Sequence, residues 1–291
     1  MKVFMGIDLT NDKKNEKVNG EEFLVARPSI ASSQSLERSV QSNDDAMKKS
    51  NLPGILRGIQ WLSGLTAIAL AYGVVKAFIE KDNITLSSAY HKAPWIFWLC
   101  IGCAVLWALL KFWSVRREKT VTNSDETLRV VNNLKANTEA VYAELSVPSY
   151  AREADVLSFL YKVKGDKIKV CDSLKRIVPY FNPVFRVYAD ANNLYLAHLE
   201  EGKFSIPLCS IKAIRAVNKR VRMMGWNKEE KYNSENYRKY KIMVDQMGCI
   251  TFKGYHIIEF DHNGEEWGIY IPSYELPTFE ALTGLKATEG K

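Results

Sequence analysis

The sequence has few of the residues that form metal centres or disulfide frameworks. Its 291 residues include five cysteines, an odd number at irregular spacing, and only four histidines. This pattern does not indicate a disulfide framework. Cys100 and Cys103 form a C-x-x-C pair, but they lie inside an apolar run with no second pair and no nearby histidine, so packing within a helix explains them. We therefore expect no metal site and no cofactor.

Signature motifs of the common enzyme classes are also missing. The sequence contains no G-x-S-x-G nucleophile motif, no phosphate-binding P-loop, no G-x-G-x-x-G and no H-E-x-x-H. The adjacent carboxylates of Glu265 and Glu266 lie beside a predicted turn, where solvated charge is their ordinary role. The expectation is a protein that is not an enzyme.

Two long uncharged runs stand out from the rest of the chain, Gly58 to Val75 and Ala93 to Leu110, each of 18 residues. In a helix this length spans about 27 Å, close to the hydrocarbon thickness of a bilayer. Cations flank both runs, and tryptophans lie near both ends of the second run, which is typical of membrane spans. Residues 53–117 are therefore predicted to form a transmembrane hairpin, with a pair of buried core helices as the alternative.

The distribution of cations predicts the orientation of this hairpin. The loop between the runs has three cations, Lys76, Lys81 and Lys92. The outer flanks have seven, namely Lys48, Lys49, Arg57, Lys111, Arg116, Arg117 and Lys119. Because cytoplasmic flanks are enriched in Lys and Arg, we expect both termini in the cytoplasm and the protein in the cell inner (plasma) membrane.

Small residues recur every four positions within the two runs. They are Ser63, Ala67 and Ala71 in the first run, and Cys100, Ala104 and Ala108 in the second. Such spacing lets helix backbones approach closely, so we expect the two spans to pack on each other rather than to dimerise. Neither run contains an acidic residue, which argues against an ion or proton pathway.

The segments on either side of the hairpin have different patterns. Residues 1–52 are polar and are predicted to be a mostly disordered tail. Its two apolar patches, residues 3–7 and 23–26, can each add as a strand to a sheet edge of this chain or of a partner. Residues 118–149 are predicted to form a connector helix that begins near Ser124 and ends by Pro148.

The connector helix has a single apolar seam formed by Val131, Leu134, Thr138, Val141 and Leu145. Two interpretations remain open. The helix packs on the domain that follows it, or it forms a short parallel coiled coil that joins two protomers at the membrane surface.

Residues 150–291 have a pattern of short strands. A hairpin is predicted around Gly165, a single strand over residues 214–223, and a turn at Asn263-Gly264. A short helix beginning near Pro277 and ending at Gly284 closes the domain. Many short strands followed by one helix predict an antiparallel barrel or sandwich that is plugged by that helix.

A family resemblance lies within these strands. The segment from Asn193 to Leu196 is followed, after a turn, by Phe204-Ser205-Ile206-Pro207-Leu208 and then by Ile211 and Ile214. A strand that ends in I-P-L and continues into isoleucines three residues apart resembles bacterial pleckstrin-homology-like (PH-like) domains, over residues 155–285. Such domains often follow two transmembrane helices. The short closing helix and the polar insertion over residues 227–239 depart from the family pattern. The resemblance implies a cytoplasmic all-β PH-like barrel or sandwich with a short C-terminal helix, in which a basic strand and its loop hold a ligand or partner.

Positive charge is concentrated between residues 212 and 241, where ten cations face three acids in a chain of net charge +7. We take Arg215, Lys219, Arg220 and Arg222 as the candidate binding residues. If residues 214–223 alternate as one strand, Arg220 and Arg222 point outward, and Arg215 and Lys219 share the other face. A solvated charged loop with no ligand is the alternative. Nucleic acid is not an expected partner, although aromatic residues interleave with the cations.

Two functions are consistent with these features. The leading hypothesis is a bacterial membrane-anchored binding or scaffold module whose cytoplasmic β domain engages a protein partner or an anionic lipid headgroup. Homo-oligomerisation through the transmembrane and connector helices is a further expectation. The second hypothesis is a ligand-gated membrane effector, in which the β domain senses a small anionic molecule and the hairpins oligomerise to disturb the bilayer.

Overall fold

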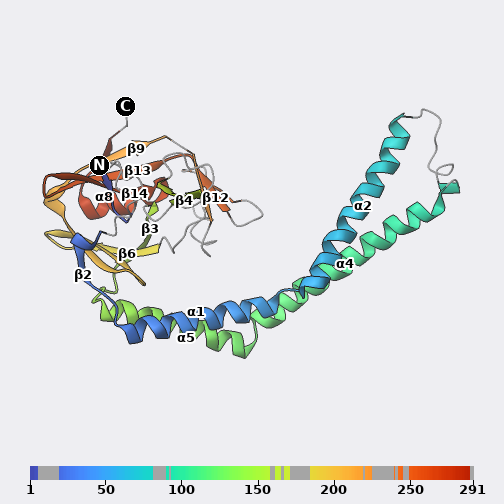
Figure 1. Cartoon of the computed structure of the whole chain (residues 1–291), viewed down its shortest axis with the longest axis horizontal. Helices are drawn as coiled ribbons and strands as arrows, with labels where there is room; N and C mark the ends of the chain where they lie inside the picture. The colour runs from blue at the N-terminus through green and yellow to red at the C-terminus, as the bar shows by residue number, and fades with distance from the viewer. Residues whose placement is uncertain are drawn as a thin grey trace. The chain divides into compact units, whose positions relative to one another are not determined.

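The fold is described here from a computed structural model, shown in Figure 1. It describes residues 1–5, 20–80, 90–91, 93–157, 161–164, 167–170, 184–218, 220–224, 239, 242–244 and 249–288. The chain divides into two compact units. Residues 34–138 form the helical unit, and residues 1–33 and 139–291 together form the β unit. The β unit is thus assembled from both ends of the chain, with the helical unit inserted between them.

The β unit contains two five-stranded sheets. The first sheet has the order β2 (Leu24–Ala26), β8 (Gly202–Pro207), β7 (Asn193–His198), β6 (Val184–Ala189) and β3 (Arg152–Asp155). The second has the order β1 (Lys2–Val3), β14 (Glu265–Pro272), β13 (Tyr255–His262), β9 (Ile211–Val217) and β15 (Ala287–Thr288). The edge strands β1 and β15 pair in parallel, and the other pairs are antiparallel. Among the residues described, no pairing joins the two sheets, so they do not close into the barrel that was one of two expected forms.

Smaller elements complete the β unit. The strands β10 (Val221–Met224), β12 (Cys249–Phe252) and β11 (Met243–Val244) form a separate sheet. The strands β4 (Tyr161–Lys164) and β5 (Lys167–Val170) form the predicted hairpin around Gly165. In the described part of the β unit, the short 3-10 turns η1 (Glu21–Phe23), η3 (Leu208–Ser210) and η4 (Ser273–Glu275) lie between strands or before the closing helix α8 (Leu276–Thr283). The stop predicted at Gly284 is confirmed, because this glycine has a φ of +71° and donates its N–H to the Glu280 carbonyl.

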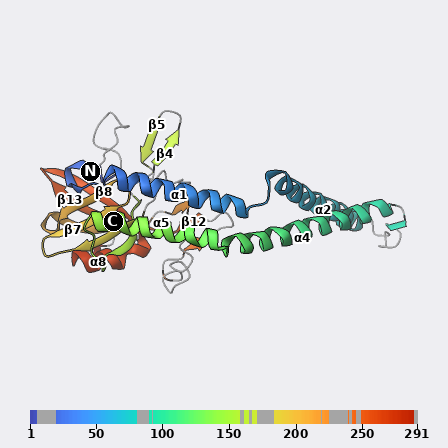
Figure 2. The ribbon, with the colours of Figure 1, turned by 90° about the horizontal axis from the view of Figure 1, so that it is seen from below.

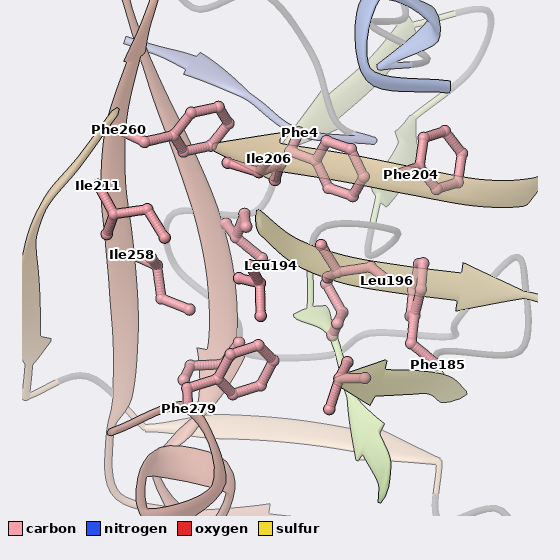
Figure 3. Packing of buried hydrophobic residues seen from close by; sticks show 14 of the residues in the cluster. Phe4, Phe185, Leu194, Leu196, Phe204, Ile206, Ile211, Ile258, Phe260 and Phe279 are labelled. Carbon is pink, nitrogen blue, oxygen red and sulfur yellow. The ribbon is translucent and has the colours of Figure 1, made fainter. Parts of the chain in front are cut away.

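One hydrophobic core fills the space between the two sheets. Alternate residues of β6, β7 and β8 are buried, and Figure 3 shows their side chains pointing toward those of β9 and β13. Phe279 of α8 is fully buried in the same cluster. The alternation of apolar and polar residues along these strands is what places one face of each sheet inward.

The N-terminal segment belongs to this core, so the prediction of a mostly disordered tail is wrong for the described part of residues 1–52. Lys2 and Val3 pair with β14, and Leu24 and Ala26 pair with β8. The apolar side chains beside these strands, Phe4, Met5 and Phe23, are buried in the core cluster. Both apolar patches therefore add to sheet edges of this chain, although residues 6–19 lie outside the described residues.

The helical unit contains two helices that are long and apolar enough to cross a membrane, over Gly54–Lys76 of α2 (Gly54–Glu80) and over the whole of α4 (Pro94–Thr122). They pack on each other, and side chains of α4 lie close to the backbone of α2. A Cβ added to Gly64 would lie 2.8 Å from the Trp107 ring, and the Cys100 thiol lies 3.5 Å from the Ala67 carbonyl oxygen. The predicted four-residue repeat of small residues is wrong at its later positions in both helices, because Ala71, Ala104 and Ala108 are exposed. Because a helix has 3.6 residues per turn, residues spaced exactly four apart rotate gradually around the helix and leave the side that contacts the other helix.

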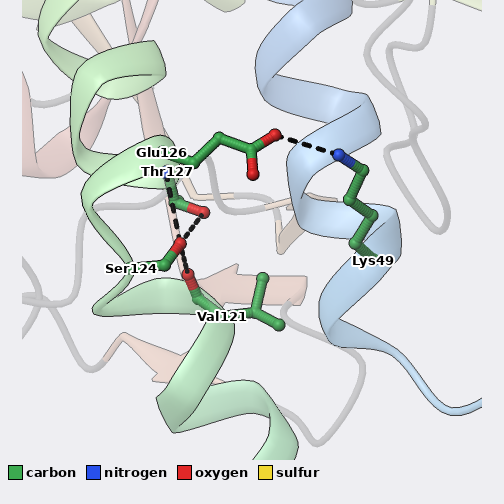
Figure 4. Close-up of polar contacts among 5 residues, drawn as sticks. All are labelled: Lys49, Val121, Ser124, Glu126 and Thr127. Carbon is green, nitrogen blue, oxygen red and sulfur yellow. Dashed lines mark hydrogen bonds and ion pairs between the residues drawn. The ribbon is translucent and has the colours of Figure 1, made fainter.

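The connector helix is α5 (Asp125–Glu144), and its predicted start is confirmed. Figure 4 shows Ser124 at this boundary, where its hydroxyl oxygen accepts the Thr127 N–H at 3.3 Å. In Figure 1 and Figure 2, α5 lies beside α1 (Ile30–Ser50), a helix that the sequence did not predict. Lys49 pairs with Glu126 at 3.1 Å, and the Asn137 amide lies 3.5 Å from the Ser35 carbonyl oxygen. These contacts make α1 and α5 an antiparallel pair.

The last turns of α5 lie in the β unit. Arg186 of β6 stacks over the ring of Tyr142 at 4.0 Å, and its guanidinium donates to both carboxylate oxygens of Glu139. Val141 and Leu145 are buried. The interpretation in which the connector packs on the following domain therefore holds at this end.

Candidate cationic binding site

The strand that carries the candidate residues is interrupted, so the prediction of one strand over residues 214–223 is wrong. The strand β9 ends at Val217 and β10 begins at Val221, and the two belong to different sheets. Val217 pairs with Tyr255, and Val221 pairs with Phe252. The connection from residue 218 to 220 thus lies opposite the two-residue connection at 253–254. We call these two connections together the crossover.

A close backbone approach holds the crossover. A Cβ added to Gly254 would lie 3.2 Å from the Val217 carbonyl oxygen and 3.2 Å from the Ser273 hydroxyl oxygen. Contacts at this distance are tighter than a side chain ordinarily makes, so a residue without a Cβ suits the position. The connection at 253–254 therefore lies directly against the end of β9 and the start of η4.

Arg215 does not lie at the crossover, and it is already paired. Its Nε donates to Glu259 Oε1 of β13 at 2.6 Å, and this hydrogen bond raises the pKa of the Arg215 guanidinium. Lys212, three residues before it on β9, pairs with Asp261 at 2.5 Å. The acids of β13 thus neutralise the cations of β9, and the cationic surface does not continue along this strand.

The two remaining described cations at the crossover are Arg220 and Lys253. Both are exposed, and among the residues described neither forms an ion pair. Lys253 was not a candidate in the sequence, because it lies 33 residues after Arg220 (253 − 220) and only strand pairing brings it near. Arg222 is on β10 opposite Thr251. The side chain of Arg222 and the whole of Lys219 lie outside the described residues, so their expected orientations stay predictions.

A buried polar cluster lies behind the crossover. Phe252 contacts the ring of Tyr274 edge to face, with centroids 5.4 Å apart. The Tyr274 hydroxyl donates to Asp155 Oδ2 at 2.8 Å, and the Asp155 N–H donates to Glu275 Oε1 at 2.9 Å. Both carboxylates are 1% exposed. Because buried hydrogen-bonded groups fix geometry, the cluster locks β3, β12 and η4 together. Neither acid has a sequence signal that distinguishes it from a surface carboxylate.

The chemistry available at the crossover is attraction of anions. Its described charged side chains are cations, and a pair of exposed cations in a fixed position raises the local concentration of acidic ligands. No group of three or more His, Cys, Asp and Glu that would hold a metal ion occurs among the described residues. No nucleophile and base stand together at the crossover in the described part of the chain.

Comparison with known proteins identifies no relative, since the chain matches no family model, no curated protein and no solved structure.

Proposed function

We propose that this chain is a membrane-anchored binding module. Its α2–α4 hairpin spans the cell membrane with both termini in the cytoplasm, and its β unit engages an acidic ligand at the crossover. The observation that carries the proposal is the assembly of one β unit from both ends of a chain whose middle contains two membrane-length helices. Two spans in the middle of such a chain would hold its folded domain at the membrane surface.

The strand order supports a PH-like architecture for the β unit. The strands β3, β6, β7 and β8 are antiparallel neighbours in one sheet, β9, β13 and β14 are antiparallel neighbours in the other, and α8 follows. Two antiparallel sheets followed by a helix agree with the resemblance carried by Ile206-Pro207-Leu208. The added edge strands β1, β2 and β15 and the shortness of α8 are features of this chain.

The crossover supports the binding role. Arg220 and Lys253 are exposed cations without described ion-pair partners, and the sequence places Lys219 and Arg222 next to Arg220. Near an anionic membrane surface, each such cation contributes about 1 kcal/mol of attraction. The same charges favour an acidic surface on a protein partner.

Binding is tested on the full chain in phosphatidylcholine nanodiscs. Vesicles containing phosphatidylglycerol probe lipid binding, and pull-down from lysate of the source cell probes protein partners. Arg220→Glu/Lys253→Glu should abolish recovery in one of the two assays. Arg27→Glu/Arg152→Glu changes the same number of charges at exposed positions of the β unit and should leave recovery unchanged. Full recovery with the folded crossover variant would make the cations a solvated surface only.

Topology has its own test. Ser87→Cys places a thiol in the loop between the proposed spans, and an impermeant maleimide should label it in intact cells. Labelling of a cysteine placed in the N-terminal segment, with none at residue 87, would reverse the proposed orientation.

A further inference from the structure

The antiparallel pair of α1 and α5 has two unlike sides. One side has a cavity of about 200 Å³ lined by Ser35, Arg38, Ser39 and Ser42 of α1 and by Val130 and Asn133 of α5. Successive helix residues are rotated by about 100°, so the residues on the far side of the contact line can be identified from these lining residues. They are Val40 and Met47 on α1, and Leu128 and Val131 on α5.

These far-side residues are apolar and accessible. Val40 is 42% exposed, Met47 is 38% exposed and Leu128 is 49% exposed, and Val131 is half-buried. Val40 and Met47 are seven residues apart, so they lie on the same side of α1. Val131 and Thr138 have the same spacing and lie on the same side of α5. We call Val40, Met47, Leu128 and Val131 the α1–α5 strip.

The pair of helices buries little by itself. Of the 21 residues of α1, only Leu36 and Ala46 are buried. Its contact face is otherwise made of small polar residues such as Ser39 and Asn43. Amphipathic helices gain most of their stability from packing an apolar face, so a pair with an uncovered strip is incomplete.

Charges beside the strip are complementary between the two helices. Glu37 and Asp44 lie beside it on α1, and Lys135 lies beside it on α5. All three are exposed, and among the described residues none forms an ion pair. The contacts from Lys49 to Glu126 and from Asn137 to Ser35 set the register, which places Lys135 at a level between Glu37 and Asp44. A second pair turned by a two-fold rotation about the strip would bring Lys135 of one copy to Glu37 and Asp44 of the other.

We propose that the α1–α5 strip is the interface with a second copy of this chain, in a four-helix arrangement where α1 of each copy contacts α5 of the other. The proposal rests on the proposed membrane anchoring, since two copies anchored in one bilayer present the strip at the same height and in the same direction. A two-fold interface brings the same surface of both copies together. It therefore needs a surface that has both signs of charge, as the surface beside the strip does. This proposed interface differs from the coiled coil considered from the sequence. In that coiled coil only the connector helix of each copy takes part, whereas here both α1 and α5 contribute.

The test uses full-length copies carrying two different fluorophores in proteoliposomes, with energy transfer measured at decreasing protein-to-lipid ratios. Flotation of the labelled chain with the vesicles is scored first, so failure of anchoring is distinguished from failure of pairing. Val40→Glu/Met47→Glu puts two carboxylates into the strip and should weaken association more than about a hundredfold. Gln34→Glu/Gln41→Glu adds the same two charges at the same seven-residue spacing on an exposed face of α1, and should leave transfer unchanged.

A charge exchange tests the predicted contact between copies. Lys135→Glu alone, and Glu37→Lys/Asp44→Lys alone, should each weaken self-association about tenfold by placing like charges together. Mixing the two variants restores both sets of opposite charges and should restore transfer. If Val40→Glu/Met47→Glu loses helical content, the charge exchange still tests the proposed contact between copies. Three results would each overturn the proposal. The wild-type chain shows no energy transfer, or the strip and control variants show equal transfer while both stay folded. The third is that the mixed charge variants do not recover transfer.

Discussion

Replacing Phe23 with alanine should unfold the β unit far more readily, although this residue lies before the two membrane-length helices and most of the β unit follows them. Phe23 is 3% exposed and its ring contacts four others. Its centroid lies 6.1 Å from that of Phe4, 5.4 Å from Phe260, 4.7 Å from His262 and 5.0 Å from Trp267. It therefore joins the N-terminal segment to β13 and β14.

The magnitude follows from burial and from the cavity left behind. Removing a fully buried phenylalanine ring costs about 3–5 kcal/mol in the free energy of unfolding, because the lost transfer free energy adds to an unfilled cavity. A tenfold change in an equilibrium constant corresponds to about 1.4 kcal/mol. The population of the unfolded β unit should thus rise by at least about a hundredfold. Val25, two residues further on, is 57% exposed, so Val25→Ala should change stability by less than about 0.5 kcal/mol.

The assay is hydrogen–deuterium exchange of the full chain in detergent micelles, followed on peptides that cover β13 and β14. Phe23→Ala should speed exchange of their slowest amides by about a hundredfold, and Val25→Ala should not. Exchange of α2 and α4 serves as an internal control, because these helices lie in the other unit. If Phe23→Ala leaves the protection of β13 and β14 within about threefold of wild type, the N-terminal segment is not part of the core.

Three further perturbations have defined outcomes. Gly202 has a φ of +111° and a Cβ there would lie 2.3 Å from the Ala26 carbonyl oxygen, so Gly202→Ala should cost about 1–3 kcal/mol and speed amide exchange in β2 before β7. Arg186→Lys removes the bidentate hydrogen bond to Glu139. Because that carboxylate is 62% exposed, the free energy of unfolding should fall by only about 1 kcal/mol, measured as faster amide exchange of residues 141–145. Burial lowers the pKa of His256 below its usual 6.5, partly opposed by Glu280, so the unfolded state binds the proton first and stability falls as the pH drops below about 6.5. His256→Phe should flatten that fall in thermal unfolding between about pH 6.5 and 5, and an unchanged pH profile would exclude His256 as its source.

Much of the fold was predictable because local signals agree with tertiary packing. Two uncharged runs of helical length give α2 and α4, and the Asn263-Gly264 turn gives the hairpin of β13 and β14, where both residues have positive φ angles. In the same way Ser124 followed by two acids fixes the start of α5. Each of these features needs only neighbouring residues, so a sequence pattern contains it.

The elements that were missed depend on partners distant in the chain. The helix α1 is rich in Ser and charged residues and buries only Leu36 and Ala46, so its composition resembles that of a disordered segment until α5 packs beside it. The strands β1 and β2 have two and three residues, and their pairing partners lie more than 170 residues away. Strand propensity over so few residues has no predictive value, because the pairing and the core supply the stability.

The candidate site was only partly predictable for the same reason. The excess of cations around Arg220 was visible in the sequence, but the pairing of Arg215 with Glu259 depends on the register of β9 and β13. No local pattern in the sequence places the acids at residues 259 and 261 opposite the cations that they neutralise. Lys253 was missed because the crossover, and not sequence distance, brings it to Arg220.

The split β unit also constrains the membrane insertion that we propose. Val3 pairs with Gly268, and Leu24 pairs with Phe204, so the segments before and after the helical unit fold into one core. Strands on opposite sides of a bilayer cannot pair, and the chain between residues 26 and 152 must therefore cross the membrane an even number of times. Insertion of α2 alone, with α4 left outside the bilayer, would separate β1 and β2 from their partners and leave Phe4 and Phe23 without a core. For the proposed membrane anchor, folding of the β unit therefore requires that α2 and α4 insert as a pair, and the flanking cations would then decide which side the domain occupies.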